Sequence, residues 1–181
     1  PTLAGGGALG GDVALGGGIL TVGSSNLSTI FGGQIVGAGD LNKVGVGTLR
    51  LNGLASYSGD TLIQQGTLRV DGGMGPGGTV TVLGGTELDA RSSIARAISG
   101  VGSNSKIFAN NGTISLGDAS SFLGFNHQGQ LTVGSNSVTF DSAGYAQLGV
   151  LTTLAGGTMS APNGISLGSS SNFSGFGAIN A

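Results

Sequence analysis

The stretch GVGTLRLNGLASYSGDTLIQQGTLRV, residues 45–70, decides the fold of this chain. It holds the pattern Gly-Thr-Leu-Arg-apolar twice, at Gly47–Leu51 and at Gly66–Val70, and the two copies are 19 residues apart (66 − 47 = 19). Each copy predicts a short strand that is closed by a turn. A unit this small cannot bury its own apolar face, so it needs similar units stacked on either side. The stretch therefore predicts a repeat architecture.

The composition favours many brief strands joined by tight turns. Glycine supplies 40 of the 181 residues, roughly three times its usual share. There are only 3 prolines and no Gly-X-Y period, which excludes collagen. Hydrophobic residues make up 38% and charged residues 8% of the chain, and disordered segments show the opposite balance. The apolar residues stand in short runs between glycines, as expected for short strands.

Charge and cysteine content exclude several classes of protein. The net charge is −2 and the 6 Lys and Arg residues are scattered, whereas nucleic-acid binding needs a clustered basic surface. Without cysteine the chain has no disulfide framework and no thiolate metal site. The sequence contains no run of 18 or more apolar residues, so it predicts no membrane-spanning helix. Since the chain starts at Pro1 without a leader, we expect a processed or excised fragment of an exported protein.

Two further repeats lie in the second half of the sequence. Residues 165–176 echo residues 114–125 at an offset of 51 (165 − 114 = 51), and residues 133–140 echo residues 101–108 at an offset of 32 (133 − 101 = 32). Offsets of 19, 32 and 51 share no single period, which argues against a propeller with uniform blades. They fit a coil with about 20–25 residues per turn and inserted loops, in which 51 residues correspond to two turns.

We therefore predict an all-β fold, a parallel β-helix or β-solenoid of about eight short turns, as one domain over residues 1–181. Several apolar runs last only three to five residues, shorter than most sandwich strands. Stacked at about 4.8 Å per turn, eight turns make a rod roughly 40 Å long. Residues 86–99 are the one place where a helix competes, and there we favour a loop followed by a strand at Ile94–Ile98.

Residues 37–70 resemble the passenger-associated repeat of bacterial autotransporters. The positions that define this repeat are Gly47, Thr48, Leu49, Leu51, Tyr57, Ser58, Gly59, Thr61, Ile63, Gly66, Thr67, Leu68 and Val70. The resemblance implies a right-handed parallel β-helix that is exported through the outer membrane and located at the cell surface. The repeat carries no catalytic residues, so the resemblance assigns these positions a structural role and leaves the ligand open.

Candidate residues for catalysis are few. His127 is the only histidine, and no Gly-x-Ser-x-Gly nucleophile motif accompanies it, so we interpret it as a solvated loop residue. Glu87 and Asp89 alternate on one side of a predicted strand, with Arg91 and Arg96 close by in sequence. Paired carboxylates suit acid–base chemistry on a glycosidic bond, but we favour a surface patch of compensating charges.

Candidate binding residues have structural interpretations as well. A calcium solenoid repeats Gly-Gly-x-Gly-x-Asp in tandem, and no such tandem occurs here, so we assign the glycine-flanked aspartates to turns. The glycine triplets 5–7 and 16–18 lack the Gly-Lys-Ser/Thr of a phosphate loop. Four phenylalanines recur at the 51-residue offset, and we favour an aromatic ladder inside or capping the coil over a sugar-binding platform. The aspartates are Asp12, Asp40, Asp60, Asp71 and Asp118, and the phenylalanines are Phe122, Phe125, Phe173 and Phe176.

The sequence thus predicts a structural extracellular β-solenoid, a stalk or adhesive passenger region at the bacterial surface. It is not expected to be an enzyme, to use a cofactor or to hold a catalytic metal. The alternatives are a self-assembling filament or biofilm-matrix subunit, because exposed edge strands at solenoid ends are ready to pair, and a polysaccharide-acting β-helix enzyme. Candidate partners are a second copy, bound through the solenoid ends, and a host-surface or polysaccharide ligand.

Overall fold

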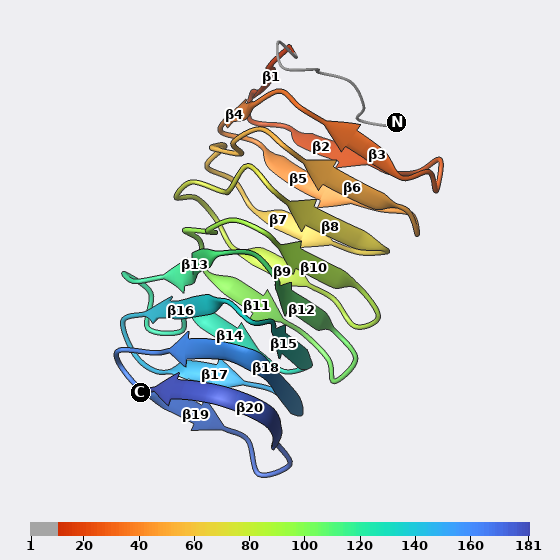
Figure 1. The fold of residues 1–181 in the computed structure, drawn as a ribbon. Coiled ribbons are helices and arrows are strands. Elements are labelled where there is room, and N and C mark those ends of the chain that lie inside the picture. Colours follow the sequence, from red (N-terminus) through yellow and green to blue (C-terminus); the bar gives the residue numbers. More distant parts are fainter. Residues whose placement is uncertain (1–10) are drawn as a thin grey trace.

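The computed structural model describes residues 11–181, which coil into a parallel β-solenoid of about eight turns (Figure 1). The glycine triplet 5–7 lies outside the described residues. Neighbouring strands pair in parallel along the axis of the coil, and residues 11–181 contain no helix. The predicted all-β solenoid is confirmed.

Each turn of the coil passes over three faces. One of them, here called the second face, is an eight-stranded sheet in which each strand pairs with the strand one turn later. In chain order its strands are β2 (Ile19–Val22), β5 (Asp40–Lys43), β7 (Thr61–Ile63), β9 (Val80–Val82), β11 (Ile98–Gly100), β14 (Phe125–His127), β17 (Ala146–Leu148) and β19 (Ile165–Leu167).

The first face is formed by most of the ten-stranded sheet. Its strands are β3 (Thr29–Phe31), β6 (Thr48–Leu51), β8 (Thr67–Val70), β10 (Glu87–Ala90), β12 (Lys106–Ala109), β15 (Gln130–Val133), β18 (Leu151–Ser160) and β20 (Asn172–Asn180). The long strand β18 pairs with β15 through its first residues and with β16 through its last, so the same sheet continues around a corner.

The third face is the most irregular of the three. It begins with the pair β1 (Val13–Leu15) and β4 (Ile35–Gly37). Its later turns consist of β13 (Thr113–Asp118), β16 (Ser137–Ser142) and the last residues of β18 and β20. Between β4 and β13 only single bridges connect one turn to the next. They link Ile35, Ala55, Met74, Ile94 and Leu116 in that order.

The two copies within residues 45–70 lie in consecutive turns of the coil, as predicted. Strands β6 and β8 pair in register, so that Leu49 lies beside Leu68 and Arg50 beside Arg69. Both leucines are buried, and Leu68 lies beside Leu88 of β10 on its other side. The bend before β8 requires glycine: Gly66 has φ = 68°, and a Cβ there would lie 2.6 Å from the carbonyl oxygen of Gly45.

The region 86–99 differs in part from the prediction. It contains no helix, but the second strand begins at Ile98 rather than at Ile94. Ile94 instead forms the single bridge from Met74 to Leu116 on the third face. The chain turns the corner between the two faces over the intervening residues, which is why Ile94 and Ile98 cannot share one strand.

The predicted equivalence of residues 114–125 and 165–176 is wrong. Ile114 lies in β13 on the third face, whereas Ile165 lies in β19 of the eight-stranded sheet. The residue two turns after Ile114 is Met159, reached through Val138 and 45 residues away (159 − 114 = 45). Turn lengths also vary, from 18 residues between Val80 and Ile98 to 27 between Ile98 and Phe125.

A buried leucine in the column Leu49–Leu68–Leu88 tests this packing. Leu68→Ala removes a fully buried side chain and leaves a cavity between two neighbouring turns, so we expect a loss of about 2–5 kcal/mol in the free energy of unfolding. Leu54→Ala is the matched control, because Leu54 is 43% exposed and its truncation costs about 1 kcal/mol or less. Urea unfolding measures both, and equal losses would contradict the assigned register.

Candidate functional site

The outer surface of the first face carries the solvent-accessible Lys and Arg side chains of residues 11–181. Of the 6 Lys and Arg residues, Arg50, Arg69, Arg91 and Lys106 lie on or beside strands β6 to β12, and the other two are buried. Asp71 accepts from the Nε atoms of Arg50 and Arg69, each at 2.8 Å, and Asp89 accepts from Arg91 Nε at 2.9 Å. The hydrogen bond from Arg69 lowers the pKa of Asp71. The cations and carboxylates therefore neutralise one another along this face.

The candidate carboxylates Glu87 and Asp89 share the outer side of β10, because Leu88 and Ala90 point into the core. Burial, together with the charge of Asp89, raises the pKa of Glu87. Glu87 lies beside Lys106 in the ladder, and Asp89 is held by Arg91. Arg96, which was expected close to these carboxylates, instead lies inside the coil. The geometry is that of a compensated surface patch.

Two buried cations were not anticipated from the sequence as interior groups. Lys43 is 1% exposed and its Nζ donates to the carbonyl oxygens of Val44, Gly45 and Gln65, at 2.7–3.0 Å. Burial lowers the pKa of its ammonium group. Lys43 stands at an inner position of β5, beside Val22 and Ile63. Through these three hydrogen bonds Lys43 links the bends of two successive turns, and no carboxylate of the described residues pairs with it.

Arg96 is the second of these cations and is fully buried. Its guanidinium donates to the carbonyl oxygens of Gly75 and Gly59, each at 2.9 Å, and to that of Tyr57. The guanidinium carbon also lies 4.3 Å from the centre of the Tyr57 ring, a cation–π contact. Arg96 therefore links three successive bends between the third and second faces.

The predicted turn role of the glycine-flanked aspartates fits the described structure. Asp40 accepts from the backbone N–H of Asp60 at 2.8 Å, and Asp60 accepts from that of Thr79 at 2.7 Å. Asp12 binds the N–H of Gln34 in the same manner, one turn onward. Asp118 caps its own bend by accepting from Ser120. Among residues 11–181 no three acidic or histidine side chains gather where a metal would be held.

The prediction for His127 is wrong, because the side chain is buried in β14 and not solvated in a loop. Burial lowers the pKa of the imidazole to about 4. The nearby backbone of Gln130 acts in the opposite direction and is the smaller effect, and neither ring nitrogen has a hydrogen-bond partner of good geometry within the described residues. The ring fills the space that Gly100 leaves one turn earlier, where a Cβ would lie 1.8 Å from Nδ1. Only the register reveals this pairing.

The predicted phenylalanine ladder is not formed. Phe125 is buried and packs on Phe140 with 4.4 Å between ring centres, while Phe122 and Phe176 are 64% and 75% exposed. Phe173 lies beside Thr152, on another face from Phe125. The four residues belong to different columns because the 51-residue offset does not match two turns.

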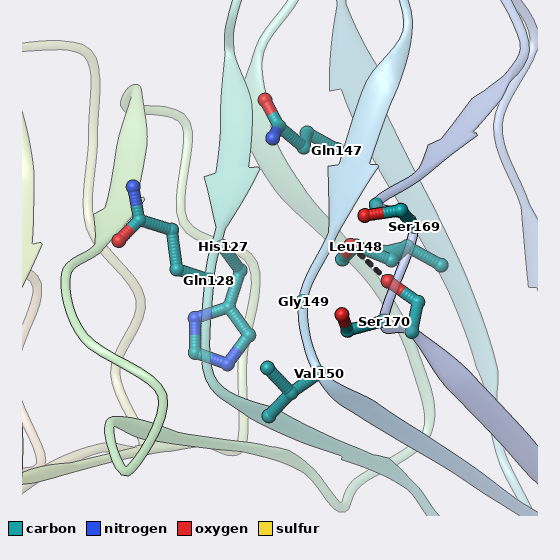
Figure 2. A pocket seen from close by; sticks show the side chains of 10 residues that line it. His127, Gln128, Gln147, Leu148, Gly149, Val150, Ser169 and Ser170 are labelled. Carbon is teal, nitrogen blue, oxygen red and sulfur yellow. Dashed lines mark hydrogen bonds between the residues drawn. The ribbon is translucent and has the colours of Figure 1, made fainter.

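A shallow hollow of about 220 Å³ opens beside β14 and β17, where the second face meets the first (Figure 2). Three successive turns contribute its walls. The hydroxyl of Ser171 donates to the carbonyl oxygen of Leu148 across it, at 3.4 Å. The lining residues are His127, Gln128, Gln147, Leu148, Gly149, Val150, Gly168, Ser169, Ser170 and Ser171. None of these side chains is a carboxylate, an ammonium or a guanidinium.

The fold and its surface define a class of protein, a parallel β-solenoid built from repeats, whose outer side chains are the ones available for contacts. Residues 41–70 match the model of the Passenger-associated-transport-repeat family. Over 91 residues, 49% of this chain, the sequence is 50% identical to a protein named adhesin BmaC autotransporter from Brucella suis biovar 1 (strain 1330). The chain spans 3% of the length of that relative. No solved structure matches the chain.

These similarities confirm the resemblance inferred from residues 37–70. The chain contains a passenger-type repeat, and its location is extracellular, at the bacterial surface after export through the outer membrane. No helix within residues 11–181 has both the length and the hydropathy that a membrane crossing requires.

Burial of His127 predicts an acid-sensitive fold. The pKa of His127 in the folded chain, about 4, lies below the ordinary value of about 6.5. The unfolded chain therefore binds a proton that the folded chain does not, and the free energy of unfolding falls as the pH drops from 6.5 towards 4. We expect the wild type to lose about 2–3 kcal/mol more than His127→Leu between pH 7.5 and 4.5. Urea unfolding at the two pH values measures this difference. Parallel losses in both proteins would contradict a buried, neutral imidazole.

Replacement of Arg96 tests the buried carbonyl contacts. Arg96→Met keeps much of the side-chain volume but leaves the carbonyls of Tyr57, Gly59 and Gly75 without this donor. We expect a loss of about 3 kcal/mol or more, since each unsatisfied buried group costs about 1–3 kcal/mol. Arg50→Met on the outer face is the matched control, with an expected loss of about 1 kcal/mol or less. Thermal and urea unfolding compare the two, and similar losses would contradict the assigned role.

Proposed function

We propose that the chain is a non-catalytic passenger segment, a stiff stalk whose outer side chains make adhesive contacts at the bacterial exterior. The observation that carries this proposal is the unbroken parallel pairing of the eight-stranded sheet from β2 to β19. Hydrogen bonds that run along the axis resist bending and local opening. The word adhesin in the name of the relative supports the adhesive part.

The interior of the solenoid suits a load-bearing role. Leu68, Leu88 and Ile107 form one column of fully buried side chains through successive turns. Arg96 and Lys43 fasten the bends, where a solenoid exposes carbonyl groups that no strand neighbour satisfies. At about 4.8 Å per turn, eight turns extend roughly 40 Å. The described segment is therefore suited to hold other parts away from the membrane.

A glycosidase function has less support. Acid–base catalysis requires one carboxyl group to remain protonated while its partner ionises in a shared cleft. Glu87 and Asp89 instead lie on an open strand surface, with Lys106 and Arg91 as their neighbours. Neither residue belongs to the hollow of Figure 2.

A second candidate function is self-association through the ends of the solenoid. Phe176 and Ile179 of β20 are 75% and 48% exposed, and Leu167 of β19 is 52% exposed. A further turn would cover them, supplied by the same longer chain or by a second copy. Sedimentation of the purified chain tests the second copy: concentration-dependent association should be abolished by Phe176→Lys, and a strictly monomeric wild type would contradict it.

Surface display tests the adhesive role. Bacteria that display residues 1–181 through a heterologous outer-membrane anchor should attach to epithelial monolayers several-fold better than bacteria that display the anchor alone. Leu68→Asp, which places a charge in the core, should abolish the gain because the outer surface depends on the folded coil. Attachment equal to that of the anchor alone, with the folded chain detected at the surface, would refute the proposal.

A further inference from the structure

The C-terminal part of the solenoid is almost free of charge. Residues 107–181 contain no Lys, Arg or Glu, and their only carboxylates besides the C-terminus are Asp118 and Asp141. The exposed Lys and Arg residues lie on the N-terminal turns, where Asp71 and Asp89 pair with Arg50, Arg69 and Arg91. An uncharged surface neither attracts nor orients a polyanion such as nucleic acid or an acidic polymer. A ligand of these turns must be recognised by hydrogen bonds and apolar contacts.

The hollow in Figure 2 offers both kinds of contact. The amides of Gln128 and Gln147 and the hydroxyls of Ser169 and Ser170 supply donors and acceptors together, and Val150 adds an apolar surface. This mixture matches the hydroxyl groups of a neutral sugar, each of which also donates and accepts. At about 220 Å³ the hollow is smaller than the roughly 300–1,000 Å³ of pockets for drug-sized ligands. Its size suits a single sugar ring.

Two polar side chains at this position are left without partners. Both ring nitrogens of His127, in the wall of the hollow, lack a hydrogen bond within the described residues, and so does the buried Oδ1 of Asn126. His127 is fully buried, whereas Asn126 lies beside Gln147 on the outer side of the sheet. Most buried polar groups in proteins have a partner. Asn126, on the outer side of the sheet, therefore has an acceptor that no group of the described residues uses, whereas the imidazole of His127 points into the coil.

An exposed aromatic pair lies at the other end of these strands, just before β14 and β17 begin. Phe122 and Tyr145 are 64% and 38% exposed, and their rings meet edge to face with 5.7 Å between centres. Tyr145 precedes β17 and lies on the same outer side as Gln147, because the intervening Ala146 is buried. A three-residue strand spans about 10 Å, so one short oligosaccharide reaches from the rings to the hollow.

From this arrangement we infer that the outer face of β14, β17 and β19 is a binding site for a neutral saccharide. The rings of Phe122 and Tyr145 contact the apolar C–H surface of one sugar, and Asn126, Gln147 and the serines of the hollow bind the hydroxyls of the next. The inference rests on the proposed adhesive function, for which it names the surface and the class of ligand.

Saccharide binding by the purified chain tests the inference. The probes are neutral oligosaccharides of glucose, mannose, galactose and N-acetylglucosamine, with hyaluronate as an acidic comparison, measured by calorimetry. We expect at least one neutral probe to bind and hyaluronate not to bind. Tyr145→Ala and Gln147→Ala should each weaken that binding about tenfold or more. Thr81→Ala, an outer position of β9 in the same sheet, should leave it unchanged, and circular dichroism should show that all variants fold.

The outcomes separate this inference from the proposed function. Absence of binding to every neutral probe at millimolar concentration overturns the saccharide site, and so does binding that is insensitive to Tyr145→Ala and Gln147→Ala. If displayed wild-type chain still promotes attachment in that case, the adhesive function stands and another surface carries it. If the chain binds a neutral saccharide but its display does not promote attachment, the proposed function fails and the site remains.

Discussion

The constraint on which this structure depends is the in-register stacking of one turn on the next. Because equivalent residues lie about 4.8 Å apart along the axis, every side chain packs against its counterparts in the neighbouring turns. Leu49, Leu68 and Leu88 form an apolar column for this reason, and Arg50, Arg69 and Asp89 form a charged column on the outside of the same strands. A column succeeds only if its members suit one another, so the repeat is a physical requirement of the fold.

Two polar side chains that interrupt inner columns, Lys43 and His127, are each accommodated by their neighbours in the adjacent turns. Lys43 lies between Val22 and Ile63, and its ammonium group reaches the carbonyl oxygens of the bend. His127 follows Gly100 in its column, and only a glycine leaves room for the imidazole. Buried charge normally requires a carboxylate partner or a set of hydrogen bonds. This coil supplies the hydrogen bonds from its bends, where carbonyl groups have no neighbour in a strand.

Sequence reasoning succeeded where the repeat was local and failed where it depended on register. The copies at Gly47–Leu51 and Gly66–Val70 repeat at the length of one turn, so their pairing was predictable. The 51-residue offset misled because the turn that ends at Phe125 is longer than the others, which separates equal sequences into different faces. His127 was misjudged for the same reason: its polar, glycine-rich flanks resemble a loop, and only its pairing with Gly100 shows that it points inward.

The scaffold also explains why the proposed saccharide site lies on the C-terminal turns. Side chains of the inner columns pack against one another, and polar groups of the bends form hydrogen bonds between turns. Only side chains of the outer columns are therefore available to a ligand. On the N-terminal turns the charged outer columns of the first face are paired internally, since Arg50 and Arg69 bind Asp71 and Arg91 binds Asp89. On the C-terminal turns Asn126 keeps an unpaired acceptor and Tyr145 an exposed ring. A surface whose polar groups lack internal partners gains more from a ligand than one whose charges are already paired.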